Sequence, residues 1–155
     1  MKKLHFSLMA ILFALFAMVS FTACSSDDDD TPSSDDIKKN IVGTWELTHI
    51  KGWVLDPADG EEKTHVKVDK SLEDSEKRKF VFKADGSCEW YDHEMGYWEK
   101  GDDFTSYELT NNELIVKGPY DTLRLNIKSL KGNTMVCTVK LYDEGDTEYT
   151  FIRKE

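Results

Sequence analysis

The sequence predicts an all-β domain, an up-and-down antiparallel β-barrel of about eight strands with a short helix at its N-terminal end. Three observations support this fold class. Apolar and polar residues alternate with a period of two in several short segments. Turn-forming pairs such as Asp85-Gly86 and Gly132-Asn133 separate these segments. The connections are short, which favours a meander that closes on itself and leaves no exposed edge.

Residues 1–23 have the pattern of a secretory signal peptide. Lys2 and Lys3 precede an apolar segment, residues 8–19, and the small residue Ala23 stands just before Cys24. A membrane-spanning helix needs about 20 apolar residues, so this segment is too short to be one. We therefore expect residues 1–23 to be removed on export.

The segment Phe21-Thr22-Ala23-Cys24 resembles the lipobox of bacterial lipoproteins, although Phe21 stands where that family most often has Leu. The resemblance implies that the Cys24 sulfur receives a diacylglyceryl group and that the new amino terminus is acylated after cleavage. Two acyl chains give stable attachment. We therefore expect a lipid anchor at Cys24 to hold the protein on a membrane without a transmembrane helix.

Residues 24–36 are predicted to be a disordered, acidic tether that starts at the lipidated cysteine. Residues 25–36 consist of Ser, Thr, Pro and Asp only, so no apolar burial offsets the entropy of ordering them. The aspartates at 27–30 resemble the export signal that directs some Gram-negative lipoproteins to the outer leaflet of the outer membrane. This resemblance implies an outer-membrane location, with the cell surface favoured over the periplasmic face.

The chain is acidic, with a formal net charge of −10 at pH 7. Removal of residues 1–23 takes away two lysines and no acidic residue, which brings the charge of the remaining chain to −12. Such a surface repels phosphate backbones, so we expect no nucleic-acid partner. Solubility accounts for the acidity, while a cationic partner or divalent cations remain open.

Residues 37–155 are long enough for one domain with a core of its own. A short helix is expected at its start, because Ser34 can cap it, acidic residues follow the cap and lysines lie near its end. Ile37 and Ile41 are four residues apart and share one helical face.

The remainder is predicted to be β-structure. The clearest strand alternates Leu123, Leu125 and Ile127 with polar residues. The predicted strands cover residues 44–50, 80–82, 88–92, 97–99, 104–109, 113–117, 122–128, 134–141 and 147–153. Residues 52–79 are predicted to be irregular, either a lid in which Trp53 closes on a ligand or a solvated insertion. The insertion is favoured, because Leu72 alone cannot seat a helix on the core.

Four motifs in this order resemble the lipocalin-like lipoproteins of Gram-negative bacteria. Gly43-Thr44-Trp45 resembles the start of the first lipocalin strand, and the segment ending at Arg153 resembles the last strand. Between them lie Phe-x-Phe-x-x-Asp-Gly at residues 80–86 and Gly-Tyr-Trp at 96–98. The resemblance implies a lipocalin-like barrel in which Arg153 stacks on Trp45, so that both residues are structural.

The sequence leaves two functions open. In the first, the barrel holds a small apolar or amphipathic ligand among candidate residues that share aromatic or apolar character: Phe80, Phe82, Trp90, Trp98, Leu125 and Trp53. In the second, the barrel is filled by its own side chains, and its aromatic and acidic outer surface contacts a glycan or a protein. An eight-stranded barrel permits either arrangement. Neighbours on a strand face opposite sides, so one of Trp90 and Tyr91, and one of Tyr97 and Trp98, should be partly exposed.

No motif indicates catalysis, a cofactor or a metal site. His49, His65 and His93 lie on separate segments without metal-ligand spacing, and no nucleophile elbow or phosphate-binding loop is present. We therefore expect a protein that is not an enzyme and needs no cofactor. Cys88 and Cys137 could form a disulfide, but the alternation around Cys137 places it on a core face, which favours free thiols.

Overall fold

The computed structural model of the chain describes residues 33–56, 64–143 and 145–155. The predicted signal peptide, Cys24 and most of the predicted tether lie outside the described residues. Within these described residues, one short helix, one 3-10 turn and ten strands follow in order: α2 (Ser34–Asn40), β1 (Gly43–Asp56), β2 (Thr64–Ser71), η1 (Asp74–Glu76), β3 (Arg78–Phe82), β4 (Cys88–Glu94), β5 (Tyr97–Gly101), β6 (Ser106–Thr110), β7 (Glu113–Lys117), β8 (Thr122–Lys131), β9 (Thr134–Tyr142) and β10 (Gly145–Lys154). The predicted all-β class with a short N-terminal helix is confirmed.

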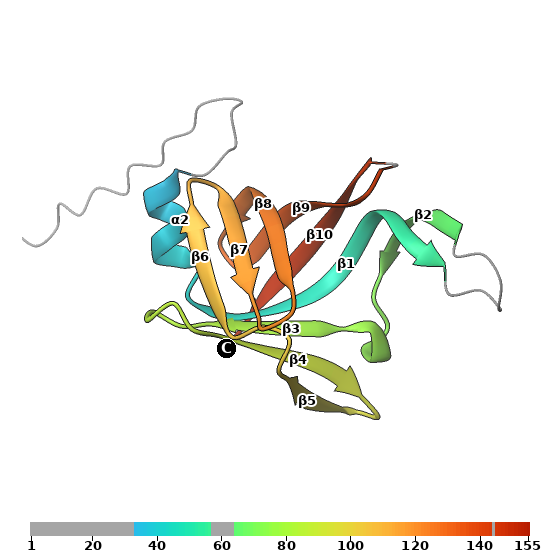
Figure 1. Cartoon of the computed structure of the whole chain (residues 1–155), viewed down its shortest axis with the longest axis horizontal. Helices are drawn as coiled ribbons and strands as arrows, with labels where there is room; N and C mark the ends of the chain where they lie inside the picture. The colour runs from blue at the N-terminus through green and yellow to red at the C-terminus, as the bar shows by residue number, and fades with distance from the viewer. Residues whose placement is uncertain (1–32, 57–63, 144) are drawn as a thin grey trace, which may run out of the picture.

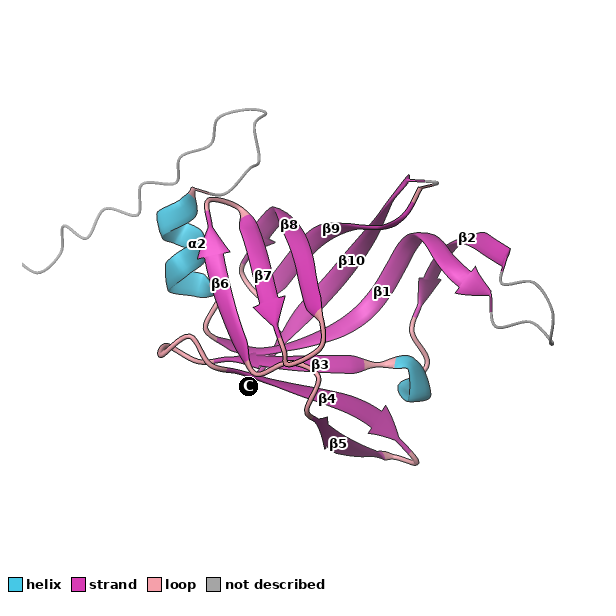
Figure 2. Cartoon of the chain, in the orientation of Figure 1, coloured by secondary structure: helices cyan, strands magenta, loops and turns pink. Residues whose placement is uncertain are grey.

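The strands form one antiparallel, up-and-down sheet that curls into a half-barrel (Figures 1 and 2). Its order is β5-β4-β3-β1-β10-β9-β8-β7-β6, so β1 joins the two halves of the meander. Closure is partial. Strands β5 and β6 are the two ends of the order, and the nearest link across the opening is a bridge between Ser87 and Ser106, beside a hydrogen bond of 2.9 Å from the Cys88 N–H to the Thr105 carbonyl. The Tyr107 N–H also donates to the Gly86 carbonyl at 2.9 Å, so the start of β6 is linked to the residues before β4. The expectation that no edge is exposed is therefore wrong for β5 and for the part of β6 beyond Tyr107.

The prediction of an irregular stretch over residues 52–79 is also wrong. Strand β1 continues to Asp56 and pairs with β2, which extends the sheet as a two-stranded arm (Figure 1). At the base of this arm the Thr147 Oγ1 accepts from the Trp53 N–H at 3.0 Å and donates to the Trp53 carbonyl at 2.8 Å. A side chain thus satisfies the backbone where β1 leaves β10. Gly52 is required here, because a Cβ would lie 2.7 Å from the Thr147 Cα.

Helix α2 lies at one end of the curled sheet (Figure 1), and Ile37 in the helix and Ile41 at its C-cap belong to the core. Ile37 is 0% exposed and Ile41 is 2% exposed. The cap is Ser33 rather than the predicted Ser34: the Ser33 Oγ accepts from the Asp36 N–H at 3.2 Å. Ser33 has the extended backbone that an N-cap requires, whereas Ser34 is already inside the helix.

The core lies on the inner face of the curled sheet and is continuous with the isoleucines at α2. Its most deeply buried members are Trp45, Phe82, Leu114, Val116, Leu125, Ile127, Met135, Cys137 and Phe151. Cys88 and Cys137 are both buried and free, as the sequence favoured. All described members of the buried cluster lie between residues 37 and 151, so we expect residues 33–155 to fold as an independent domain.

Candidate functional site

A cavity of about 290 Å³ opens in the half of the barrel away from α2. It lies between β1, β3, β4, β8, β10 and the segment before β6. Its lining is mainly apolar and half of it is aromatic: Leu47, Ile50, Glu76, Arg78, Phe80, Trp90, Phe104, Leu123, Tyr149 and Phe151. We refer to these residues as the aromatic pocket. Sheet alternation turns one side chain of every neighbouring pair inward, as at Arg78 and Phe80 and at Tyr149 and Phe151. On β1, a register shift between Leu47 and His49 brings both Leu47 and Ile50 to the lining.

Three rings form the wall of the aromatic pocket on one side. Phe80 and Trp90 are register partners on β3 and β4, with ring centroids 4.9 Å apart. Phe104 lies 5.8 Å from Phe80 and 5.7 Å from Trp90. The three rings are tilted or perpendicular to one another, which is the arrangement that aromatic quadrupoles prefer. The wall is therefore held by mutual packing.

Charged side chains stand at the mouth of the pocket. Arg78 forms an ion pair through Nε with Asp92 and donates from Nη1 to the Lys77 carbonyl at 2.9 Å. Its guanidinium carbon lies 5.9 Å from the centre of the Trp90 ring. Glu76 accepts from Lys70 at 2.5 Å, and this hydrogen bond is the main cause that lowers the pKa of the Glu76 carboxyl. Both charges of the mouth therefore have partners of opposite sign.

The Trp90 indole carries a donor without an acceptor. Its Nε1 is buried and has no hydrogen-bond partner among the described residues. The ring edge lies against Gly101, its register partner on β5, where a Cβ would stand 2.4 Å from the Trp90 Cδ1 and 2.8 Å from Nε1. A buried, unpaired donor costs about 1 to 3 kcal/mol. The absence of a Cβ at Gly101 is what leaves room for the Trp90 indole against β5.

The six candidate ligand-binding residues divide into three groups. Phe80 and Trp90 line the aromatic pocket. Phe82 and Leu125, each 1% exposed, belong to the buried core and are not among the residues that line the pocket. Trp98 and Trp53 lie elsewhere: Trp98 is on the outer face, and Trp53 is on the β1–β2 arm beside Gly145.

Trp98 belongs to a cluster on the outer face of β3, β4 and β5. The Lys79 ammonium lies 4.3 Å from the centre of the Trp98 ring and 4.5 Å from that of Tyr91, and burial lowers the pKa of Lys79. His93 packs edge-on against Trp98 at 4.8 Å. Tyr97 is 57% exposed, as expected for one member of its pair. Trp98 therefore packs against Lys79 on the outer face of the sheet and does not line the aromatic pocket.

Beside this cluster, Glu89 binds three donors. Lys83 at 2.9 Å, Lys100 at 3.0 Å and the Tyr91 hydroxyl at 2.9 Å all donate to its carboxylate. These hydrogen bonds, with that from Lys83 the largest, lower the pKa of Glu89 to about 2. Glu89 therefore stays ionised in moderately acidic solution.

The sequence did not indicate several pocket residues. The inward direction of Leu123, Tyr149 and Phe151 follows from strand alternation, but their position along the barrel does not. Leu47 and Ile50 are three residues apart, and both line the pocket because of a register shift between Leu47 and His49, which the sequence did not indicate. Phe104 was assigned to a strand, whereas it precedes β6 and reaches across the opening of the sheet to Phe80 and Trp90. Arg78 lay at the edge of the stretch predicted to be irregular and carried no local signal.

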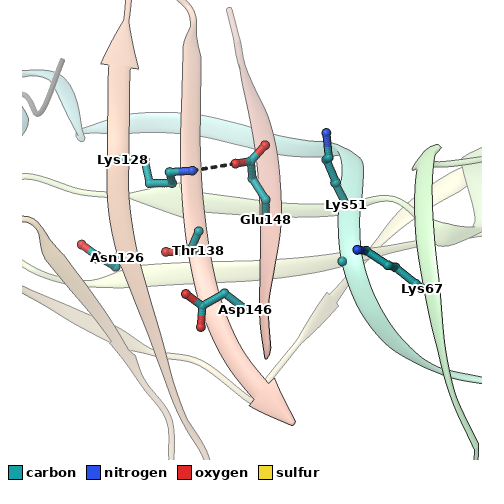
Figure 3. Close-up of a pocket in the computed structure, with 8 residues that line it drawn as sticks. Lys51, Lys67, Asn126, Lys128, Thr138, Asp146 and Glu148 are labelled. Carbon is teal, nitrogen blue, oxygen red and sulfur yellow. Dashed lines mark hydrogen bonds and ion pairs between the residues drawn. The ribbon is translucent and has the colours of Figure 1, made fainter. Parts of the chain in front are cut away.

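A second hollow, of about 480 Å³, lies on the outer face of the sheet between β8, β9, β10, β1 and β2 (Figure 3). Its lining is polar: Lys51, Gly52, Lys67, Asn126, Lys128, Thr138, Asp146 and Glu148. Lys128 and Glu148 form an ion pair at 3.0 Å across it. This hollow is open and charged, so it is unsuited to an apolar ligand.

The end of the barrel next to α2 is closed by Trp45 and Arg153. These residues are register partners on β1 and β10, and the Arg153 guanidinium lies 4.4 Å from the centre of the Trp45 ring, as the sequence predicted. The Trp45 Nε1 donates to the Ile41 carbonyl at 2.7 Å. This end therefore offers no entry for a ligand.

The described part of the chain contains no group of three or more His, Cys, Asp or Glu side chains that could hold a metal ion. Over the same residues, no helix has the length and apolar character to cross a membrane.

Comparison with known proteins gives one family. The family model described as a lipocalin-like domain matches residues 41–137, which is more than half of the chain. The match runs from the start of β1 into β9 and so includes most of the aromatic pocket. No curated protein and no solved structure matches the chain.

Proposed function

The chain belongs to the lipocalin-like domain family, and on this premise we propose that it binds a small apolar or amphipathic molecule in the aromatic pocket. The observation that supports this function best is the pocket itself, a cavity of about 290 Å³ with five aromatic side chains in its lining. Pockets for small molecules span about 300 to 1,000 Å³. The ligand is therefore small, because the other half of the barrel is filled by the core.

A binding role also fits the chemistry of the site. Lipocalin-like proteins are generally binding proteins rather than enzymes. The mouth charges of the pocket are held in ion pairs, with Arg78 on Asp92 and Glu76 on Lys70. Such an arrangement favours retention of a ligand over its chemical conversion.

Dye displacement on residues 33–155 tests this function. The dye ANS should bind at one saturable site, change the Trp emission and be displaced by small apolar compounds. Leu123→Trp, which fills the mouth, should weaken dye binding at least tenfold. The matched control is Arg124→Trp on the opposite face of β8, which should leave binding unchanged. A folded wild-type domain that binds no dye, or equal binding by both variants, would contradict the proposal.

We further propose that Cys24 is lipidated and that the protein is anchored in the outer membrane with its barrel at the cell surface. The support is the lipobox-like segment ending at Cys24 and the acidic tether after it. Labelled palmitate should enter the wild-type chain and not Cys24→Ser. Protease added to intact cells should remove the barrel domain if it faces outward. Protection until the outer membrane is opened would place it on the periplasmic face instead.

A further inference from the structure

Arg78 lines the aromatic pocket and has more N–H bonds than its described partners use. Arg78 has five N–H bonds, of which the contacts to Asp92 and to the Lys77 carbonyl use two. The other three have no acceptor among the residues described. The Trp90 Nε1–H also lacks one. A ligand that fits these groups must bring an acceptor oxygen.

The carboxylates at the mouth already take part in hydrogen bonds and ion pairs. The two oxygens of Glu76 accept from Lys70 at 2.5 Å and from the Glu73 N–H at 3.1 Å. Asp92 accepts from Arg78. Each positive charge thus stands beside a negative one, so the net charge of the mouth is close to zero. A ligand acceptor finds the N–H bonds of Arg78 that no described residue uses.

The walls of the pocket favour a flat apolar body. Phe80 and Trp90 are tilted by 46° and Trp90 and Phe104 by 82°, so both faces and edges of rings line the cavity. A planar aromatic guest can extend this pattern of offset and edge-to-face contacts, each worth about 0.5 to 1.5 kcal/mol beyond its burial. The volume of about 290 Å³ suits one or two fused rings.

Resting on the function proposed above, we propose that the ligand is a planar aromatic molecule with one acceptor oxygen, a carbonyl or a carboxylate, which binds the Arg78 guanidinium at the mouth. The ring lies among Phe80, Trp90 and Phe104. Arg78 is therefore the residue that determines specificity, and the three rings supply affinity.

Three probes with a common naphthalene body test this inference on residues 33–155: 2-naphthoate, 2-acetylnaphthalene and 2-methylnaphthalene. Their dissociation constants are measured by competition with ANS. The wild type should bind the acid and the ketone about tenfold more tightly than the hydrocarbon, which corresponds to about 1.4 kcal/mol. Arg78→Met, which keeps the apolar stem, should abolish that preference and change the hydrocarbon affinity less than about twofold. Arg124→Met, on the outer face, should behave as the wild type.

The outcomes separate the two proposals. Hydrocarbon bound as tightly as the ketone, or an equal loss of all three probes in Arg78→Met, overturns the acceptor inference and leaves the cavity as a binding site. Failure of all three probes to bind a folded wild type overturns the proposed function and the inference with it. An acid bound more tightly than the ketone identifies an anionic ligand, and equal affinities identify a neutral one; both support the role of Arg78.

Discussion

Replacement of Arg153 by methionine should destabilise the domain far more than the same change at another strand arginine. The Arg153 guanidinium lies 4.4 Å from the centre of the Trp45 ring, a contact worth about 0.5 to 2 kcal/mol. It also donates to the Val42 carbonyl at 2.8 Å and to the Asn40 carbonyl. These two hydrogen bonds contribute about 0.5 to 1.5 kcal/mol each. We therefore expect a loss of about 2 to 4 kcal/mol.

The large effect follows from where the two carbonyls lie. Asn40 ends α2 and Val42 immediately precedes β1, so Arg153 on the last strand ties the helix to the barrel. The positive charge also faces the negative end of the helix. Without the guanidinium, the carbonyls lose their partner and Ile37 and Ile41 are held less firmly over the core.

Thermal and urea unfolding of residues 33–155, followed by circular dichroism and Trp emission, measures this effect. For a domain of this size, 1 kcal/mol lowers Tm by about 4 °C, so Arg153→Met should lower it by about 8 to 16 °C. The control is Arg124→Met, which removes an exposed ion pair to Glu113 at 3.3 Å and should cost less than about 1 kcal/mol. Arg153→Lys should fall between the two, because lysine keeps the charge and loses the planar fork. Equal losses in the two methionine variants would refute the reasoning.

Three further predictions concern other parts of the domain. Burial raises the pKa of the Cys88 and Cys137 thiols to about 12 each. A thiol reagent at pH 8 should therefore label neither cysteine in folded residues 33–155 and both cysteines after denaturation. Rapid labelling of the folded domain would contradict this prediction. Glu89 has a pKa of about 2 when folded, below its unfolded value of about 4.3, so its contacts stabilise above pH 4.3 and this contribution is lost as pH falls to about 2. The difference in unfolding free energy between the wild type and Glu89→Gln should therefore shrink over that window, and a constant difference would count against it. Gly118→Ala should prevent normal folding, because a Cβ there would stand 1.4 Å from the Asp103 carbonyl oxygen. Gly132→Ala has open space around its Cβ and should cost only about 1 to 2 kcal/mol of unfolding free energy, because of its φ of 56°. Similar stability of the two variants in urea unfolding would exclude the clash at Gly118.

Part of the fold was predictable because its signals are local. The alternation of Leu123, Leu125 and Ile127 depends only on the two-residue period of a strand, and all three are on the inner side of β8. The arm formed by β1 and β2 was missed. Its strand signal is weak, and Gly52, which looks like a strand breaker, is needed for the close approach of Thr147.

The candidate site was only half predictable for a similar reason. Phe80 and Phe82 share a strand face and have the same pattern in the sequence, yet one lines the aromatic pocket and the other is packed in the core. The difference is their depth along the barrel, which depends on what other strands place opposite them. Trp98 was expected at the ligand, but pairing of β4 with β5 directs it outward onto Lys79.

The sequence by itself determined the β-class, the helix that begins the domain and the pair Trp45 and Arg153, because each depends on residue type at short range or on a family motif. Only the tertiary structure decided that the barrel is half filled and half open, and that Arg78 stands at the mouth with free donors. These features depend on register and on side chains from strands far apart in the chain, which the order of residues along one strand does not encode.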